Sequence, residues 1–342
     1  MKAAIYEDIE RIVLKNVDAV KPPPGYVVVD TKCSGICGSD LHNYYGEWDQ
    51  SHTHAQGHEV AGVVVEVGDG VEGFQPGEKV TMECFSHDGT CDFCSRGQYN
   101  HCTGREWFSG DGHGGFAEFT MMHASSLFRL PDTFTFEEGA LVEPLAVAHR
   151  AVMQSGLTHR DRVLVMGGGT IGLLTLATAV AAGVRETAIT AKYPQQIGIA
   201  KELGVDHVID ISRDPVTDFV TEWTECGADC VIETVGGAGN FNDSLSCVRK
   251  RGTVVLVAGY FEPLEVDLRK IVWSEAVVTG SNCYAYSGRE KDFDAAIELI
   301  ASGKVDATKI VSHRLPLTEV VEAFRIAADK SSGSVKVHVV QE

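Results

Sequence analysis

Three cysteines stand close together in one short segment of the 342-residue chain. Their spacing is C-x2-C-x7-C, and they are Cys91, Cys94 and Cys102. Three residues before the first cysteine stands Asp88, and Cys84 and His87 are neighbouring alternatives for a fourth ligand. Thiolates with one carboxylate at this spacing can enclose a tetrahedral zinc ion. The segment therefore predicts a structural zinc site, and the alternative is a reduced loop without metal.

A second group of metal-competent residues is spread along the chain. Cys37 lies in a glycine-containing turn, His58 and Glu59 directly precede a β-branched run, and Glu143 comes much later. Cysteine, histidine and carboxylate are the ligand types of a catalytic zinc site that keeps one position open for water or substrate. Spacing alone does not show whether these distant residues meet in space.

A glycine loop follows the apolar run that starts at Val163. The pattern GxGxxG directly after a strand and before a helix is typical of dinucleotide binding, because it allows the pyrophosphate to approach the helix N-terminus closely. The residues expected at the cofactor here are Gly167, Gly169, Thr170, Ile171 and Gly172.

The next apolar run ends in Ala191, Lys192 and Tyr193, where NAD-binding proteins place a carboxylate for the ribose 2′-hydroxyl. A small residue followed by a cation and an aromatic ring would admit a 2′-phosphate, which a carboxylate would repel. We therefore predict NADP(H) rather than NAD(H), and the alternative is that Lys192 is an ordinary exposed lysine.

Composition excludes several other functions. Acidic residues outnumber basic ones 48 to 29, for a net charge of −19. This balance argues against nucleic acid and against an anionic membrane surface as partners. The first residues are typical of a strand rather than of a signal peptide, and the longest apolar run is too short to span a membrane. Because six of its ten cysteines lie between residues 33 and 102, clustered as for metal, we expect a reduced, cytoplasmic protein.

The elements that position these residues fall into two patterns. Up to about residue 150 the chain is rich in β-branched runs, such as 26–31 and 60–67. Beyond it, apolar runs start at nearly even intervals, near Val163, Thr187, His207, Cys230, Thr253 and Val277. Even spacing with helical stretches between predicts a doubly wound, six-stranded parallel sheet, hence an α/β fold. We expect one helix to start at Pro194 and stop before Gly204, and another over 288–301 with a capping box at Ser287.

In these motifs the sequence resembles the zinc-dependent medium-chain alcohol dehydrogenases, and most closely their sorbitol/polyol dehydrogenase branch. The resemblance covers essentially the whole chain. Its most specific part is the pattern Gly-His-Glu-x2-Gly-x5-Gly-x2-Val, which starts at Gly57. The Cys37 turn, the cysteine segment, Glu143 and the glycine loop occur in the family's order.

The resemblance implies a Rossmann dinucleotide-binding domain, residues 149–282, inserted into a β-rich GroES-like catalytic domain, residues 1–148 and 283–342. It implies a catalytic zinc in the cleft between them, with Cys37, His58 and Glu59 as zinc-associated residues. Glu143 would be either a ligand or the partner of the zinc-bound water.

The resemblance also implies roles for residues around the zinc and the cofactor. Ser39 and His42 match the relay that carries the alcohol proton outward. Two segments match positions beside the nicotinamide, and they comprise Val257, Ala258, Gly259, Ser281, Asn282 and Cys283. Apart from the resemblance, the aromatic residues Tyr44, Trp48, Trp107 and Tyr284 are candidate substrate contacts, and the alternative is ordinary core or interface packing.

Some residues depart from the family pattern. Asp88 stands where the structural site usually has a fourth cysteine, and Asn43 precedes Tyr44 where the polyol branch has a tyrosine. Cys283 replaces an arginine expected to bind substrate hydroxyls, which argues against sorbitol itself.

Together these features predict reversible oxidation of a secondary alcohol, such as a polyol, sugar or cyclitol, by hydride transfer to a nicotinamide cofactor. The alternatives are a non-enzymatic, crystallin-like member of the superfamily and a zinc-free enone or quinone reductase. The latter would lack Cys37, His58 and Glu59. Family members are dimers or tetramers, so we also expect a homotetramer or homodimer.

Overall fold

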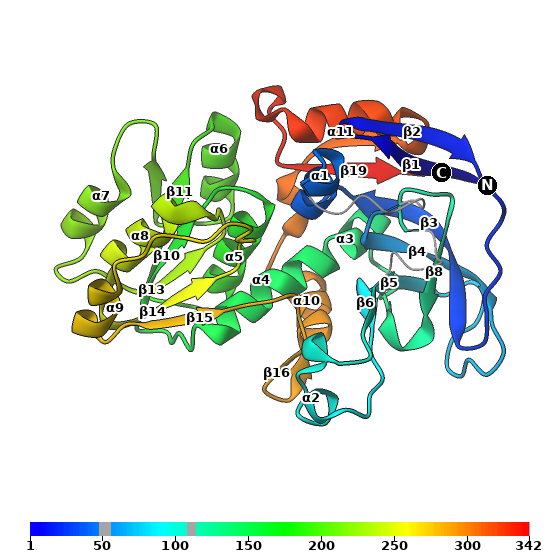
Figure 1. The fold of residues 1–342 in the computed structure, drawn as a ribbon, viewed down its shortest axis with the longest axis horizontal. Helices are drawn as coiled ribbons and strands as arrows, with labels where there is room; N and C mark the ends of the chain where they lie inside the picture. The colour runs from blue at the N-terminus through cyan, green and yellow to red at the C-terminus, as the bar shows by residue number, and fades with distance from the viewer. Residues whose placement is uncertain (48–55, 108–113, 342) are drawn as a thin grey trace. The chain divides into compact units, whose positions relative to one another are not determined.

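The computed structural model describes residues 1–47, 56–107 and 114–341. Contacts divide the chain into two compact units, residues 1–143 with 311–342 and residues 144–310. Figure 1 draws both units with the chain coloured from its N-terminus to its C-terminus. The boundaries at 148/149 and 282/283 that the resemblance implies stay a prediction.

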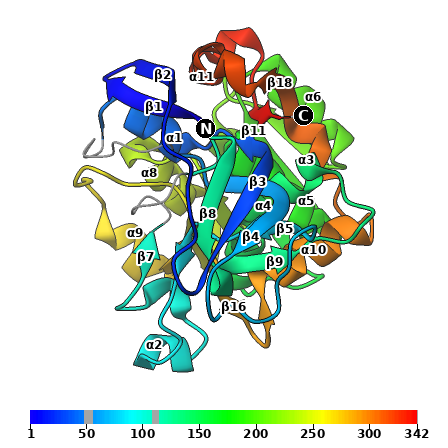
Figure 2. The ribbon, with the colours of Figure 1, turned by 90° about the vertical axis from the view of Figure 1, so that its right-hand side faces the viewer.

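The first unit is built on a β-sheet of order β18-β19-β3-β4-β5-β9, with β8 also paired to β3 (Figure 2). The central strand is β3 (Tyr26–Gly35), whose β-branched run at Val27, Val28 and Val29 is buried. The other strands are β4 (Glu59–Val67), β5 (Lys79–Met82), β8 (Phe119–His123), β9 (Leu127–Arg129), β18 (Val311–Pro316) and β19 (Lys336–Val340). The runs predicted at 26–31 and 60–67 are thus strands.

Short elements complete this unit. The helices are α1 (Gly38–Tyr44), α2 (Asp92–Ser95), α3 (Phe136–Ala140) and α11 (Val320–Ala328). Two further strand pairs are β1 (Lys2–Asp8) with β2 (Arg11–Asn16), and β6 (Phe85–Ser86) with β7 (Glu106–Trp107). The last strand, β19, pairs antiparallel with β3, so the end of the chain returns to the sheet of its beginning.

The second unit contains a parallel sheet of six strands in the order β12-β11-β10-β13-β14-β15. The strands are β10 (Arg162–Met166), β11 (Glu186–Ala191), β12 (His207–Asp210), β13 (Ala228–Glu233), β14 (Val248–Leu256) and β15 (Val277–Gly280). The order reverses between β10 and β13, which is where doubly wound folds bind their ligands. The predicted six-stranded parallel sheet is confirmed.

Two groups of helices pack around this sheet. Helices α5 and α6 contact each other, and α8 contacts both α7 and α9. Their bounds are α5 (Thr170–Ala181), α6 (Pro194–Glu202), α7 (Val216–Trp223), α8 (Gly237–Cys247) and α9 (Leu268–Ser274). The unit also holds most of α4 (Val142–Gln154), together with α10 (Asp292–Ala301) and the short strands β16 (Tyr286–Ser287) and β17 (Glu290–Lys291).

The two helix boundaries predicted for the second unit have different outcomes. Helix α6 begins at Pro194 as expected, and Gly204 after its end has a φ of +87°, which suits a glycine. The helix expected from residue 288 begins four residues later, so the capping box is wrong. Gly288 has a φ of +73° and lies between β16 and β17. Ser287 Oγ donates instead to Asp292 Oδ1 at 2.6 Å.

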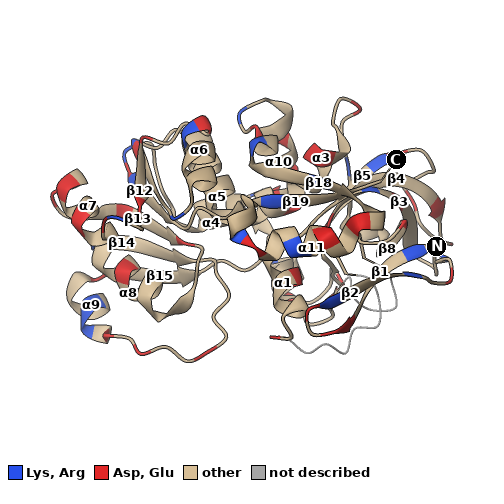
Figure 3. Cartoon of the chain, turned by 90° about the horizontal axis from the view of Figure 1, so that it is seen from above, with Lys and Arg blue, Asp and Glu red and all other residues tan. Residues whose placement is uncertain are grey.

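No helix among the described residues is long and apolar enough to cross a membrane. In the view of Figure 3, Lys and Arg are interspersed with Asp and Glu along both units.

Candidate active site

Cys37, His58 and Glu59 meet at one end of the β3–β4 pair. Gly35 at the end of β3 lies opposite Glu59 at the start of β4. Cys37 comes two residues after Gly35, and His58 comes directly before Glu59. One thiolate, one ring nitrogen and one carboxylate oxygen of the three residues lie within 4.8 Å of one another. The antiparallel register therefore brings together residues that are 21 positions apart in the sequence.

A buried lysine holds the carboxylate of this cluster. Lys336 Nζ on β19 donates to Glu59 Oε1 at 2.7 Å, to Glu59 Oε2 at 2.6 Å and to the Ile36 carbonyl at 2.9 Å. Both charged side chains are only 1% exposed. Gly35 is required here, since a Cβ on it would lie 1.9 Å from Glu59 Oε2. A carboxylate oxygen has two lone pairs, so Glu59 can still approach a cation while bound to Lys336.

Negative charges dominate the surroundings of His58. Burial alone would lower its pKa, but Cys37, Asp40 and Glu143 outweigh that effect and raise the pKa well above its usual value. Asp40 Oδ1 lies 4.0 Å from His58 Nδ1, and Asp40 Oδ2 accepts from the Cys37 backbone N–H at 2.8 Å. Burial raises the pKa of Asp40 itself to about 6. An excess of negative charge in a buried cluster favours binding of a cation.

The remaining residues predicted at the catalytic centre lie near this cluster. Glu143 is buried in the first turn of α4 and lies outside the group within 4.8 Å. Ser39 and His42 are three positions apart on α1 and are both half-buried. His42 Nδ1 contacts Glu47 Oε2. Residues at this spacing share one face of a helix, and the predicted proton relay stays a prediction.

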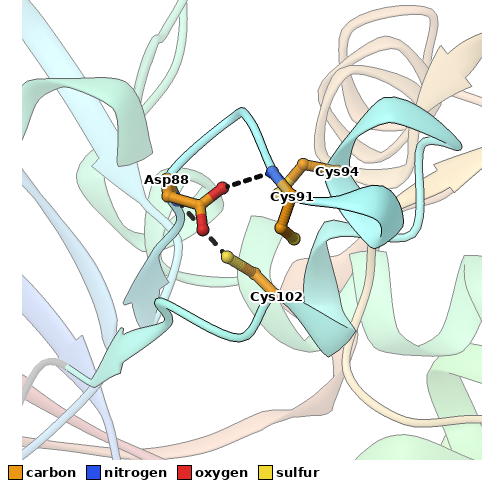
Figure 4. Close-up of side chains that lie close together, drawn as sticks. All are labelled: Asp88, Cys91, Cys94 and Cys102. Carbon is orange, nitrogen blue, oxygen red and sulfur yellow. Dashed lines mark hydrogen bonds between the residues drawn. The ribbon is translucent and has the colours of Figure 1, made fainter.

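The cysteine segment forms a second cluster in the same unit. One ligand atom from each of Asp88, Cys91, Cys94 and Cys102 lies within 4.8 Å of the others, and Figure 4 shows the four side chains together. Asp88 Oδ1 accepts from the backbone N–H of Cys91 at 2.9 Å, and backbone hydrogen bonds lower the pKa of the Cys91 thiol to about 7. This shift favours the thiolate of Cys91, which is the form that binds a metal.

Of the three candidates for the fourth position, the structure brings Asp88 into this cluster. Cys84 is buried elsewhere, and the His87 ring lies 4.5 Å from the Tyr99 ring. Neither contributes a ligand atom to the cluster within the described residues.

The glycine loop in the second unit has the geometry of a phosphate-binding turn. Gly167 has a φ of +111°, and a Cβ on Gly172 would lie 1.8 Å from the Gly167 carbonyl oxygen. Gly169 is the N-cap of α5, and a Cβ on it would meet nothing within 4 Å. Thr170 and Ile171 open the helix, whose first N–H groups have no partner within the helix itself. The loop thus leaves space in front of a helix N-terminus.

The tip of β11 lies against this loop. A Cβ on Gly168 would come within 3.2 Å of Ala191 Cβ. Ala191 is buried, Lys192 is exposed and Tyr193 is half-exposed. Gln196 Oε1 accepts from the Lys192 and Tyr193 backbone N–H groups at 3.0 and 3.3 Å. A side chain of α6 therefore holds the backbone at Lys192 and Tyr193, where we predict that the 2′-phosphate of NADP(H) binds.

The two segments predicted at the nicotinamide follow β14 and β15, at the sheet edge that also carries the glycine loop. The Val257 N–H donates to the Glu233 carbonyl at 2.9 Å, and the Ser281 N–H donates to the Leu256 carbonyl at 2.9 Å. Cys283 has a φ of +52°, which is unusual for a residue other than glycine. The roles of these segments, which include Ala258, Gly259 and Asn282, stay a prediction.

The candidate substrate residues that the structure describes lie in different surroundings. Trp48 lies outside the described residues. Trp107 on β7 is 48% exposed, with the Arg105 guanidinium 4.2 Å from its ring. The Tyr44 ring packs 5.6 Å from the ring of Phe324. Tyr284 is fully buried, with its ring 4.7 Å from that of Phe293.

Comparisons with known proteins agree with this arrangement. Residues 23–132 match the alcohol dehydrogenase GroES-like domain, and residues 170–302 match the zinc-binding dehydrogenase domain. The chain is 36% identical to 2-dehydro-3-deoxy-L-galactonate 5-dehydrogenase of Pseudoalteromonas atlantica, over 90% of this chain and 89% of that protein. It is 33% identical to sorbitol dehydrogenase of Halalkalibacterium halodurans, over 93% and 92% of the two chains.

This chain belongs to the zinc-dependent medium-chain alcohol dehydrogenases. The crystal structure of 2R,3R-butanediol dehydrogenase from Bacillus subtilis shares its fold with a TM-score of 0.88 and 32% identity, covering 100% of this chain and 99% of that one. The protein is therefore an NAD(P)-dependent alcohol dehydrogenase with a GroES-like and a Rossmann-type part.

Two residues of this dehydrogenase that shape the site were missed from the sequence. Asp40 follows Cys37 by three positions, and the carboxylate in that glycine-rich turn was a signal available in the sequence. Lys336 lies 277 positions after Glu59, and only the pairing of β19 with β3 brings it there. A lysine within a strongly apolar C-terminal strand is unusual and was the only local sign of a buried partner.

We predict that Lys336→Met destabilises the dehydrogenase by about 3–5 kcal/mol, because it leaves the Glu59 carboxylate buried without its partner. The measurement is the free energy of unfolding in urea. Lys15→Met is the matched control, since Lys15 forms an exposed ion pair with Glu7 and its loss should change the free energy of unfolding only slightly. Equal effects of the two substitutions would contradict the structural importance of the buried pair.

Proposed function

We propose that this dehydrogenase reversibly oxidises a secondary alcohol of the polyol, sugar or cyclitol class at a zinc ion bound by Cys37, His58 and Glu59. The observation that carries the proposal is the approach of their three ligand atoms to within 4.8 Å in the GroES-like part of the chain.

The donor set fits zinc. Thiolate, imidazole and carboxylate are its usual protein ligands, and three such ligands leave a fourth position for substrate. The charges that raise the pKa of His58 also favour a divalent cation at this place. When bound, zinc supplies a Lewis acid that stabilises negative charge on the substrate oxygen, while the nicotinamide cofactor accepts the hydride.

The chain's own residues move the proton and orient the ligands. In this proposal Ser39 accepts the alcohol proton, and His42, three positions later on the same helix, passes it outward to solvent. Imidazole suits this step because it titrates near neutral pH. Lys336 holds the Glu59 carboxylate, the carboxylate of Asp40 lies 4.0 Å from His58, and the buried Glu143 adds negative charge or a further ligand.

The substrate class rests on the relatives and on one departure from the family pattern. The two relatives named above act on a sugar acid and on a sugar alcohol, which are both polyhydroxylated. This chain has Cys283 in place of a hydroxyl-binding arginine, so we expect a substrate other than sorbitol. Tyr44, Trp48, Trp107 and Tyr284 remain the proposed substrate contacts.

A second, structural zinc is proposed at Asp88, Cys91, Cys94 and Cys102. Their arrangement in one loop supplies four donors and closes the site to substrate. With the Asp88 carboxylate added to the three thiolates, the site has the four ligands that a tetrahedral zinc ion requires.

Metal analysis combined with turnover tests both zinc sites. We expect about two zinc ions per chain in the wild type, and about one in Cys37→Ser and in Cys94→Ser. Cys37→Ser should lose turnover of polyols but keep its melting temperature, whereas Cys94→Ser should melt several degrees lower. Cys226→Ser, at an exposed cysteine outside both clusters, is the control and should change neither. Wild-type protein without zinc, or a fully active Cys37→Ser variant, would refute the proposal.

We further propose that the dehydrogenase prefers NADP(H) to NAD(H). The support is the tip of β11, where Ala191 leaves room and Lys192 supplies an exposed positive charge. The glycine loop would hold the pyrophosphate at the N-terminus of α5, through Gly167 to Gly172. Tyr193 can stack or donate a hydrogen bond at the same position.

Lys192→Ala should raise the KM for NADPH about tenfold or more and leave the KM for NADH nearly unchanged, because a charged hydrogen bond to phosphate is lost. Steady-state kinetics with both cofactors measures this difference. Lys201→Ala, at an exposed lysine near the end of α6, should alter neither value. A wild-type preference for NADH would contradict the proposal.

The expected homo-oligomer is also a proposal. Exposed apolar side chains on α9 and on the edge strand β15 support it, and they are Leu268, Val272, Trp273 and Val277, which are 54–75% exposed. Apolar groups at an open sheet edge are costly in water and are usually covered. Light scattering should give a dimer or tetramer mass, and the 36.9 kDa of a monomer would contradict it.

A further inference from the structure

The tip of β12 lies directly beside the predicted 2′-position. In the parallel register of β11 and β12, Ala191 is opposite Asp210, and the Ile211 N–H donates to the Ala191 carbonyl at 3.1 Å. Adjacent strands are about 4.8 Å apart, so side chains at these two strand ends can reach one ligand group. The sequence places Asp210 nineteen positions after Ala191, and only the sheet order makes them neighbours.

This tip carries a small charged turn. Asp210 Oδ1 accepts from the Ser212 N–H at 3.1 Å and from the Ser212 hydroxyl at 2.6 Å. Asp210 Oδ2 lies 3.2 Å from Arg213 Nε. The Arg213 side chain is 79% exposed, so its guanidinium is held at one nitrogen and open to solvent elsewhere.

We propose that Arg213 is the second cation that binds the 2′-phosphate of NADP(H), opposite Lys192, and that Asp210 orients Arg213 for it. The inference rests on the proposed preference for NADP(H). Arginine suits this role because its planar guanidinium offers several donors that match phosphate oxygens. Asp210 engages Nε and leaves the two terminal nitrogens for the ligand.

Asp210 could either accept hydrogen bonds from the ribose hydroxyls or serve as the partner of Arg213, and its contacts distinguish the two roles. A free carboxylate here would accept from ribose hydroxyls and repel a phosphate, which would favour NAD(H). Its contacts with Arg213 and Ser212 instead engage both of its oxygens within the turn. Arg213 and Lys192 together then give the β11–β12 edge two exposed positive charges, against the engaged carboxylate of Asp210 and the exposed Asp214 that follows Arg213 in the same turn.

Calorimetric binding of 2′,5′-ADP and of 5′-AMP to the full-length protein isolates the contribution of the 2′-phosphate. We expect the wild type to bind 2′,5′-ADP more tightly. Arg213→Ala should lower that preference about tenfold or more, with 5′-AMP binding unchanged. Arg160→Ala is the matched control, because this exposed arginine precedes β10 at the opposite edge of the sheet.

Asp210→Asn supplies a second, independent arm. It keeps the size of the side chain but removes the ion pair that orients Arg213, so 5′-AMP should bind within about twofold of wild type, while 2′,5′-ADP binding should weaken severalfold. A loss of 5′-AMP binding in this variant would identify Asp210 as a ribose-hydroxyl acceptor and would overturn the inference.

The outcomes separate this inference from the proposal on which it rests. A wild type without preference for 2′,5′-ADP overturns both. A wild-type preference that survives Arg213→Ala unchanged, in a protein whose melting temperature is also unchanged, overturns the role of Arg213 alone and leaves the NADP(H) preference to Lys192.

Discussion

A buried ion pair between Glu59 and Lys336 ties the start of β4 to the start of β19, beside the cysteine and histidine of the candidate zinc site. Removing two charges from water costs several kcal/mol for each, so such a pair persists only with close geometry and further hydrogen bonds. Here three short contacts from one ammonium group satisfy that condition. Gly35 leaves the space that the carboxylate occupies.

The Glu59–Lys336 pair also affects the balance of charge around the candidate zinc site. Asp40, Glu59 and Glu143 place three carboxylates there, and Lys336 pairs with that of Glu59. A divalent cation would compensate most of the remainder, which is the electrostatic reason to expect zinc at this place. The same lysine connects Glu59 to the last strand of the chain.

Local patterns in the sequence were sufficient for much of the fold. The β-branched runs of the first unit, the six evenly spaced strands, the glycine loop and the start of α6 at Pro194 are all short-range features. The expected start of a helix at residue 288 failed because Ser287 bonds the side chain of Asp292 rather than capping a helix. A capping box is defined by side-chain types, and the sequence does not reveal which hydrogen bond those side chains make.

The site itself could be predicted only in part. Cys37, His58 and Glu59 were found from residue types and from resemblance, and the β3–β4 register explains why they meet. The positions of Lys336 and Asp210 depend on strand order. The pairing of β19 with β3 brings Lys336 to Glu59, and the pairing of β12 with β11 brings Asp210 beside Ala191. Residue spacing carries no information about such pairings until the topology is known.

The central claim is that Cys37, His58 and Glu59 bind a catalytic zinc ion while Lys336 holds Glu59 in place. Anomalous diffraction from crystals at the zinc absorption edge tests it most directly. The account predicts a strong peak about 2.3 Å from Cys37 Sγ and about 2.0–2.1 Å from a ring nitrogen of His58, with the ion pair to Lys336 intact. Crystals with a zinc peak only at the Asp88 cluster, or with none, would contradict it.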